Sequence, residues 1–417
     1  MKVLFLNYMN TSLPTMIRTL ELAKATSHQG HQVTLSFMHP AFNPPAFFYD
    51  VIKAFKSERL LIRYKSYAES RKPKDGPPGK ITESKPRLIG LIRQIISSLR
   101  YIPEEIKLLK EIRPDVIIAR PDHVVSFIFT AKYLRIPLIL ETDGPIEELD
   151  FFWGISSRWL RYIDLIRGRS ADAILYISNV CGQLWLNKGI PEERLFLCPN
   201  GADPEVFRPL SLTEREKIRH QFGLRGSTVI GFSGNQRRWH GIDRLLKSVI
   251  PLLRQNPLIK IFIIGTIEDK RSLGLNNLPV DIIEKQVIFT GAVNYLEMPK
   301  IIDISDIVVM PYPSMELFHF SPMKMFEAMS LGKIIIAPLQ GQIADILSSL
   351  DSAILYEPDQ GDALLNAIKL GLEVVSNGMN GISGRELLIR GHSWTTRGKV
   401  VSEACSYAIK SKKLANA

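Results

Sequence analysis

The sequence is poor in cysteine, and its few cysteines follow no functional spacing. There are three among 417 residues, Cys181, Cys198 and Cys405, and none lies in a C-x-x-C pair or a Cys/His cluster. This excludes a disulfide framework and gives no support to a zinc site. We expect all three side chains to be buried as apolar residues.

Long apolar stretches are also missing. No part of the chain approaches the run of about 18 apolar residues that indicates a transmembrane helix. The first residues, MKVLFLNYM, contain too short an apolar stretch for a signal peptide and lack its small-residue cleavage site. They predict a strand instead, and we expect a protein that is made and kept in the cytosol.

The sequence does contain a regular alternation of apolar strand candidates with helical patterns. Its composition is globular, with 45% hydrophobic and 23% charged residues, and its length suits two α/β domains of about 200 residues each. The alternation predicts βαβ units, hence two Rossmann-like, doubly wound parallel-sheet domains. The predicted strands are Val3–Leu6, Val33–Phe37, Val116–Ala119, Leu138–Glu141, Ala173–Ile177, Leu195–Cys198, Val229–Phe232, Lys260–Ile264, Val287–Thr290, Ile307–Met310, Ile334–Ala337 and Ala353–Tyr356.

A turn-rich segment marks the predicted domain boundary. PNGADPEVFRPL, residues 199–210, contains many turn formers and predicts the crossing from one sheet to the next. We expect an N-terminal domain at 1–205, a C-terminal domain at 206–390, and a C-terminal segment at 391–417.

The net charge of +11 is concentrated in one segment. Residues 51–113 hold 16 Lys and Arg against 7 Asp and Glu, interleaved with aromatic and aliphatic residues. Within RLIGLIRQIISSLRYI the apolar residues recur at helical spacing, with arginines at the margin. A basic amphipathic patch of this kind suits an anionic membrane surface, and a core-facing helix with a solvated basic face explains it equally well. Nucleic acid is a third option, but no nucleic-acid motif accompanies the charge.

The most specific signal lies in residues 312–346, where a strand candidate leads through a loop into a helix. Ser321 is a preferred N-cap residue and Pro322 is favoured at the first helical position. A helix that starts in this way aims free N–H groups and a positive dipole end at a phosphate, and Lys324 adds charge there. Glu327 lies about 9 Å along the helix axis from Ser321, roughly the span from a diphosphate to a ribose. An ordinary αβ unit with a solvated glutamate is the alternative.

A second candidate phosphate site lies in VIGFSGNQRRWHGIDRLLKSV, a predicted strand, glycine loop and helix. The loop is neither a Walker loop nor a G-x-G-x-x-G fingerprint. Gly234 permits a close backbone approach, while polar and positive residues crowd near the predicted helix start: Asn235, Arg237, Arg238 and His240.

Acidic residues cluster after the predicted strand at 138–141, in IPLILETDGPIEELD. Ligands of open α/β sheets bind at the carboxyl ends of the strands, so this cluster is a candidate for chemistry. For Asp143 the alternative is a turn-forming aspartate before Gly144-Pro145. His28 and His31 fall in a predicted turn and are expected at the surface.

Together these segments resemble glycosyltransferase family 4, in particular a subgroup that reads F-S-P-L-K-L-F-E-Y-M-A-A-G-K followed by G-Q-I. The hinge segment is similar to the family's P-N-G-V-D-x-x-x-F-x-P signature, and VIFTGAV at 287–293 is similar to the strand and turn beside the donor base. The matching residues of the main motif are Phe320, Ser321, Pro322, Lys324, Phe326, Glu327, Met329, Gly332, Lys333, Gly341, Gln342 and Ile343. One departure stands out, because His319 occupies the position of the first of the family's two glutamates.

The resemblance implies GT-B architecture, in which an acceptor-side domain at 1–205 and a donor-binding domain at 206–390 face each other across a cleft. It also implies that a C-terminal helix at 391–417 packs back on the N-terminal domain. It implies transfer of a glycosyl group, with retention of configuration and by front-face attack, from a nucleoside diphosphate sugar to a sugar or lipid-linked acceptor. Nucleic acid is not expected as a partner. No cofactor or metal is expected, and no D-x-D motif stands at a plausible strand end. The implied donor-binding residues are Gly234, Asn235, Arg237, Arg238, His240, Val293, His319, Phe320, Ser321, Pro322, Met323, Lys324 and Glu327.

Catalytic candidates follow from the same resemblance. Asp143 stands where the subgroup commonly has Asn and where many relatives have a histidine at the reaction centre, and Glu141 precedes it in a segment similar to L-E-V-N-G-P. Backbone amides at 10–13 are expected to face the transferred sugar.

Two other functions stay open at this stage. A nucleotide-sugar epimerase on the same scaffold would release epimerised donor without needing an acceptor. A catalytically inactive protein could keep the fold and use its basic segment on a membrane or a polysaccharide, an option that His319 and Asp143 keep open. Slow donor hydrolysis or transfer would remove the inactive protein from consideration.

Overall fold

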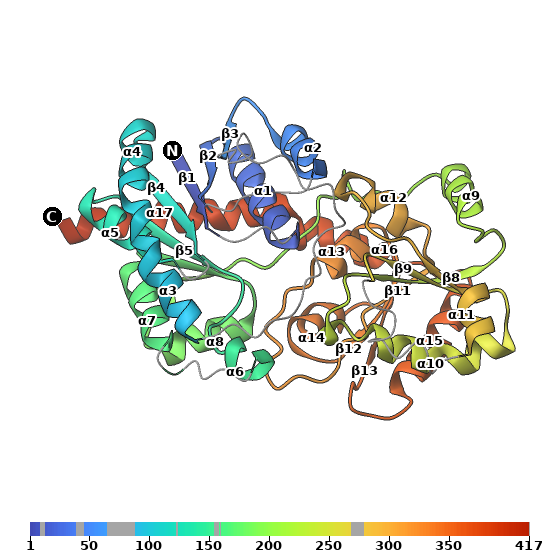
Figure 1. Ribbon diagram of the computed structural model, residues 1–417. Coiled ribbons are helices and arrows are strands. Elements are labelled where there is room, and N and C mark those ends of the chain that lie inside the picture. The colour runs from blue at the N-terminus through green and yellow to red at the C-terminus, as the bar shows by residue number, and fades with distance from the viewer. Residues whose placement is uncertain are drawn as a thin grey trace. The chain divides into compact units, whose positions relative to one another are not determined.

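The computed structural model describes residues 1–8, 13–38, 46–64, 88–121, 124–153, 158, 160–267 and 279–416. The expected sugar-facing amides at 10–12 and the basic stretch at 65–87 lie outside these described residues. The chain divides into two compact units. Unit 1 consists of Met1–Asn200 with Trp394–Ala417, and unit 2 is Gly201–Ser393 (Figure 1).

Unit 1 is built on a parallel sheet of seven strands in the order β3-β2-β1-β4-β5-β6-β7. The strands are almost continuous apolar runs, because helices cover both faces of the sheet and bury both sets of side chains. Their bounds are β1 Lys2–Asn7, β2 Gln32–Phe37, β3 Leu60–Tyr64, β4 Val116–Arg120, β5 Leu138–Thr142, β6 Ala173–Tyr176 and β7 Leu195–Leu197.

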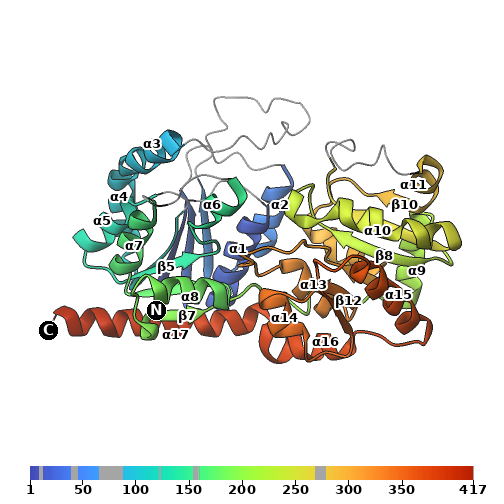
Figure 2. The same cartoon turned by 90° about the horizontal axis from the view of Figure 1, so that it is seen from below.

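Helices cover this sheet, and one of them comes from the far end of the sequence. The helix α17 packs on α1 and on strands β4 to β7 and lies along unit 1 (Figure 2). A Cβ atom at Gly398 would lie 2.6 Å from the carbonyl oxygen of Ala25, so the close approach of these helices requires glycine. The helices are α1 Leu13–His28, α2 Ala46–Phe55, α3 Leu88–Ser98, α4 Ile102–Ile112, α5 Ser126–Tyr133, α6 Glu148–Trp153, α7 Leu160–Ser170, α8 Asn179–Asn187 and α17 Trp394–Asn416, with short 3-10 turns η2 Leu99–Tyr101 and η3 Glu192–Arg194.

Unit 2 repeats the plan with a six-stranded parallel sheet in the order β10-β9-β8-β11-β12-β13. Its core is aliphatic and lies between the strands and the helices α10 and α15. The strands are β8 Thr228–Ser233, β9 Ile259–Ile264, β10 Val287–Phe289, β11 Ile307–Val309, β12 Ile334–Pro338 and β13 Ala353–Tyr356. The helices are α9 Leu212–Gln221, α10 Ile242–Gln255, α11 Val280–Gln286, α12 Met298–Asp303, α13 Met323–Ser330, α14 Gly341–Leu347, α15 Ala363–Ser376 and α16 Ile382–Leu387, with the 3-10 turns η4 Arg238–His240 and η6 Tyr295–Glu297 and the π-helix η7 Leu388–His392.

These sheets confirm the predicted fold class. Each unit has a topological switch point, where the order of the strands reverses: between β1 and β4 in unit 1, and between β8 and β11 in unit 2. In open α/β sheets ligands bind outside the carboxyl ends of the strands at such points. The sequence did not predict β3, because only two of its five residues are buried and it lies at the sheet edge.

The cysteine prediction is also confirmed. Cys181, Cys198 and Cys405 are free and buried, and burial raises the pKa of each thiol, to about 12 for Cys181 and Cys405. No helix in the described part of the chain combines the length and the apolar character needed to cross a bilayer.

Candidate active site

The helix α13 starts one residue later than the sequence indicated. Pro322, not Ser321, occupies the N-cap position, and no side chain caps the helix. The prediction of a serine cap was therefore wrong, because Pro322 adopts an extended conformation, with ψ of 117°. Without a side-chain cap, N–H groups of the first turn stay available to a ligand.

Lys324 places a cation at this helix start. Its Nζ is buried and has no hydrogen-bond partner among the described residues. The amine lies 4.7 Å from the ring centroid of Phe232 and 5.4 Å from that of Tyr312. Burial lowers the pKa of Lys324 to about 7, although the neighbouring Glu327 carboxylate favours the charged form. No described residue forms a hydrogen bond with this amine, so it is available to an anion from outside the chain.

Glu327 lies one turn further along α13 on the same face. Its side chain is buried, and among the described residues its only charged neighbour is Lys324. Burial raises the pKa of Glu327 to about 7, against the opposing effect of Lys324. The helix therefore holds a cation and a carboxyl group that no other described residue satisfies, which is costly in a folded protein and typical of a binding site.

Gly234 brings the first glycine loop against this helix. It follows β8 and has a φ of 153°, and a Cβ atom there would lie 2.8 Å from Lys324 Nζ. Gly265, after β9, packs against this loop, because its own Cβ would lie 2.1 Å from the Gly234 carbonyl oxygen. Gly234 keeps side-chain bulk away from the amine, so the two segments that the sequence marked as phosphate sites form one site at the switch point of unit 2.

His240 closes this site beside the lysine. Its Nδ1 donates to the Asn235 carbonyl oxygen at 2.9 Å. Burial and the charge of Lys324 lower the pKa of His240 to about 3, so the imidazole is neutral at physiological pH. Arg237 lies over the Trp239 ring at 5.5 Å, and the side chain of Arg238 lies outside the described residues.

An aromatic wall surrounds the same space. Tyr312 contacts Phe320 in a stacked pair at 6.3 Å and contacts Phe318 edge-on at 5.5 Å. His319 is fully buried and lies 4.5 Å from the ring of Phe320, so it is part of this wall. Of the other predicted donor residues, Ser321 is buried and Met323 is half-buried at the start of α13, whereas Val293 is half-buried in the loop that follows β10.

In unit 1 the carboxyl ends of the central strands hold a buried ionic cluster. Arg18 of α1 donates from Nε to Glu141 Oε1 at 2.7 Å and from its two terminal nitrogens to Asn200 and the Cys198 carbonyl. Arg120, at the end of β4, donates to the same Glu141 oxygen at 3.2 Å. Both arginines and Glu141 are almost completely excluded from solvent. Glu141 therefore holds two arginines in place and lies beneath the surface of the site.

Asp143 lies at the solvent side of this cluster. Its carboxylate accepts a hydrogen bond from Arg120, and one third of its side chain is exposed. Burial opposes ionisation, but the charges of Arg120 and Arg18 outweigh it and lower the pKa of Asp143. The group is thus an ionised hydrogen-bond acceptor at neutral pH. Within the described ranges, no three His, Cys, Asp or Glu side chains lie together as a metal site would require.

Sequence reasoning missed Arg18, Arg120, Phe232 and Tyr312. Arg120 carried a weak signal, since an arginine directly after the apolar run VIIA is unusual for a buried strand. Arg18 carried none, because its partners Glu141 and Asn200 are 123 and 182 positions away in the chain.

Comparisons with known proteins agree with this arrangement. Residues 17–206 match the family model described as Glycosyltransferase Family 4, and residues 227–373 match that described as Glycosyl transferases group 1. The chain is a glycosyltransferase of the GT-B type. The first match spans most of unit 1 of this glycosyltransferase, and the second spans the β8, β9 and β11 segments and α13 that form the site of unit 2.

Individual relatives of this glycosyltransferase are distant. Mannosylfructose-phosphate synthase from Agrobacterium fabrum is 24% identical over 241 residues, 55% of this chain and 52% of that protein, so the match spans about half the curated relative. Anabaena HepE (Alr3699) in complex with UDP has a TM-score of 0.72 at 17% identity, covering 97% of this chain and 100% of that chain. Sucrose-phosphate synthase from Thermosynechococcus elongatus has a TM-score of 0.64 at 14% identity, covering 96% of this chain and 97% of that chain. At these identities the structures show the fold.

Proposed function

We propose that this glycosyltransferase moves a glycosyl group, with retention of configuration, from a nucleoside diphosphate sugar to a sugar or lipid-linked acceptor. The observation that carries the proposal is the pair Lys324 and Glu327. A buried amine without a hydrogen-bond partner beside an uncapped helix start suits a diphosphate. A buried carboxyl group one turn away suits ribose hydroxyls. The same proposal includes membership of the subgroup with the F-S-P-x-K-x-F-E donor motif.

The proposed donor is a UDP sugar. HepE, which shares the fold over its whole length, has been solved with UDP and with UDP-glucose. In this chain Gly234 leaves room beside Lys324, and aromatic rings line the other side of the space. Uridine nucleotides are therefore the first ligands to test.

The proposed chemistry is electrostatic. The bond from the anomeric carbon to the diphosphate oxygen breaks, the acceptor oxygen attacks from the same face, and the acceptor proton passes to the leaving phosphate. Lys324, the start of α13 and Arg237 would stabilise the negative charge that develops on the diphosphate, in place of a metal ion. In unit 1 the ionised Asp143, held by Arg120, would accept a hydrogen bond from an acceptor hydroxyl.

A thermal-shift screen against UDP, GDP, ADP and dTDP sugars tests the donor. A sugar nucleotide at 100 times its dissociation constant should stabilise the protein by about 2.7 kcal/mol. We expect the largest stabilisation from a UDP sugar, and we expect Glu327→Ala to weaken that binding about tenfold by removing the ribose acceptor. Glu373→Ala, on the exposed side of α15, is the matched control and should bind as the wild type does. A flat response to every sugar nucleotide would refute the proposed function.

The proposal includes a peripheral position on an anionic membrane. In α3, Ile95 packs against the small core of Leu149 and Leu160, whereas Ile92 and Ile96 are 44% and 63% exposed. The helix is therefore core-facing on one side and carries an uncovered apolar face on the other, with exposed Arg93 and Arg100 nearby. Exposed apolar side chains flanked by arginines suit the interface of an anionic bilayer.

Ile96→Glu should abolish most of the binding to such a membrane. The substitution puts a negative charge on the exposed apolar face, where anionic lipids would repel it. Co-sedimentation with phosphatidylcholine vesicles containing phosphatidylglycerol measures this. Leu212→Glu is the control, because Leu212 is 79% exposed and lies on α9 in unit 2. Equal sedimentation of wild type and Ile96→Glu would contradict the membrane assignment.

A further inference from the structure

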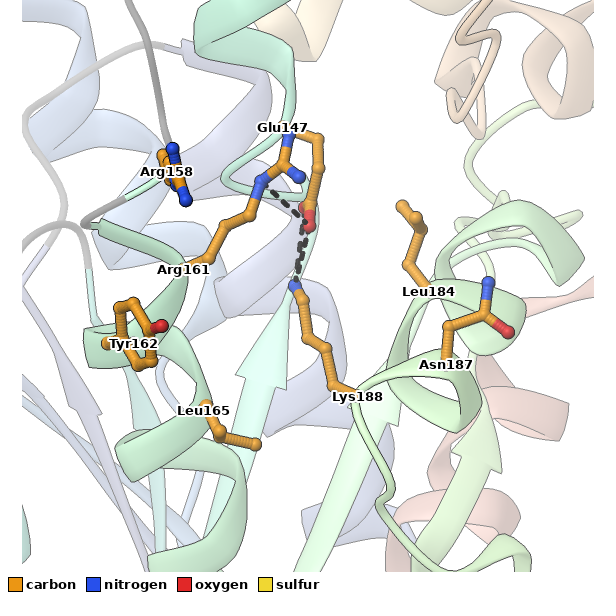
Figure 3. A pocket seen from close by; sticks show the side chains of 8 residues that line it. All are labelled: Glu147, Arg158, Arg161, Tyr162, Leu165, Leu184, Asn187 and Lys188. Carbon is orange, nitrogen blue, oxygen red and sulfur yellow. Dashed lines mark hydrogen bonds and ion pairs between the residues drawn. The ribbon is translucent and has the colours of Figure 1, made fainter.

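A groove of about 450 Å³ opens on unit 1, between α7 and α8, and the function proposed above leaves it unused. Figure 3 shows that Arg161 and Tyr162 come from α7 on one side, and that Leu184 and Asn187 come from α8 on the other. Glu147 and Lys188 converge between them. This volume lies within the range of small-ligand clefts, about 300–1,000 Å³.

The floor of the groove is a network of ion pairs. Lys188 Nζ lies 2.7 Å from Asp164 Oδ2 and 3.2 Å from Glu147, and over the Trp185 ring at 4.7 Å. Arg161 lies 3.8 Å from the same glutamate. Arg158 also lines the groove and is exposed. The floor therefore offers donors and acceptors whose charges are largely paired with one another.

The rim carries the side chains that recognise an amphipathic ring. Tyr162 is 61% exposed, so its aromatic face is open to a ligand. Asn187 is also exposed and offers both a donor and an acceptor. Leu165 and Leu184 supply apolar wall between them. An aromatic face opposite an amide, above a polar floor, matches a sugar ring, whose C–H face is apolar and whose edge carries hydroxyls.

The groove lies next to the segment that carries the catalytic candidate of unit 1. Leu184 and Lys188 also line a separate cavity of only about 10 Å³, whose other walls include Thr142 and Gly144. These two residues flank Asp143 in the chain. A saccharide in the groove would thus lie near the segment whose carboxylate is proposed to contact the acceptor.

We propose that this α7–α8 groove binds a saccharide unit of the acceptor at some distance from the reacting hydroxyl. That the saccharide belongs to the acceptor rests on the proposed function. That the groove binds a saccharide rests on the residues of the groove itself. Phosphate fits less well, because a bound anion would lie against Glu147, and because the lining cations Lys188 and Arg161 are already paired with carboxylates, Arg161 with Asp150 at 2.9 Å. Uncharged sugar rings avoid that repulsion.

Saturation-transfer NMR on the full chain tests this site. The probes are glucose, galactose, mannose, N-acetylglucosamine, maltose, cellobiose and lactose, each added alone. We expect transfer from the wild-type protein to at least one disaccharide. Tyr162→Ala should lower the affinity for that disaccharide about tenfold by removing the aromatic face. The side chain is exposed, so the variant should fold normally.

Controls separate this inference from the proposed function. Tyr133→Ala removes an equally accessible tyrosine, 70% exposed on α5, and should leave saccharide binding unchanged. Both variants should bind UDP sugars as the wild type does. The groove assignment fails if no probe binds, if Tyr133→Ala weakens binding as much as Tyr162→Ala, or if inorganic phosphate displaces the sugar. Saccharide binding at Tyr162 without any UDP-sugar binding would retain the saccharide site and remove the proposed transfer.

Discussion

Replacing Lys324 with alanine should lower turnover at least tenfold, a loss of about 1.4 kcal/mol of transition-state stabilisation. The reason is geometric as well as electrostatic. The amine is buried, lies against two aromatic faces, and has no hydrogen-bond partner among the described residues, so its charge is available to a bound ligand. A leaving diphosphate would be stabilised by this charge most strongly as the glycosidic bond breaks. Steady-state transfer or donor hydrolysis with a UDP sugar measures the effect.

The pH dependence of donor binding gives a second test of the role of Lys324. In the donor-free protein burial lowers the pKa of Lys324 to about 7, so the cation is present below that pH and is lost as the pH rises through it. A diphosphate binds the cation, so the affinity for UDP-glucose should fall between pH 7 and pH 8.5, and Lys324→Ala should lose that part of the slope. Lys247→Ala, an exposed lysine of unit 2, is the control. Unchanged turnover and an unchanged slope in Lys324→Ala would remove the lysine from the site.

Replacing Arg18 with alanine should destabilise the fold by about 3–5 kcal/mol. The guanidinium is buried and satisfies Glu141, Asn200 and the Cys198 carbonyl at once. Without it, Arg120 is the one cation that the described residues leave to the Glu141 carboxylate, which stays in a region from which water is excluded. Urea unfolding followed by tryptophan fluorescence measures the free energy.

Arg63→Ala is the matched control for this stability measurement. Arg63 also pairs with a glutamate in unit 1, but its side chain is 36% exposed and that of Glu111 is 54% exposed. Exposed pairs contribute about 0–1 kcal/mol, so this variant should unfold close to the wild type. Arg18→Lys should fall between the two, because an ammonium keeps the charge but cannot form the three-partner fork. If Arg18→Ala unfolds within 1 kcal/mol of the wild type, the cluster has no structural importance.

Most of the fold could be predicted from the sequence, because buried parallel strands are short apolar runs that stand out from amphipathic helices. All twelve predicted segments overlap observed strands. The edge strand β3 could not be found in this way, since its exposed residues include Leu61 and its sequence merges into the basic segment. Its pairing with β2 decides its structure, and that pairing is a tertiary contact.

The candidate site was predictable only in part. Lys324 and Glu327 lie on one helix, and their spacing and the preceding loop could be interpreted from local rules. The rings of Phe232 and Tyr312 around the amine, and the hold of Arg120 on Asp143, join residues from different strands and loops. Local sequence patterns carry no information on such contacts. The exact start of α13 depends on the extended backbone at Pro322, which residue preferences did not anticipate.

Because of the helix α17, the two units can complete their folding at different times during synthesis. Unit 2 is one continuous stretch of chain, whereas unit 1 needs residues 394–416 to cover α1. On the ribosome, the surface of α1 against which Gly398 packs stays exposed until all of unit 2 has emerged. Unit 2 can therefore finish folding first although it is encoded second, and a nascent chain stalled before residue 394 would leave this surface of α1 open to chaperones.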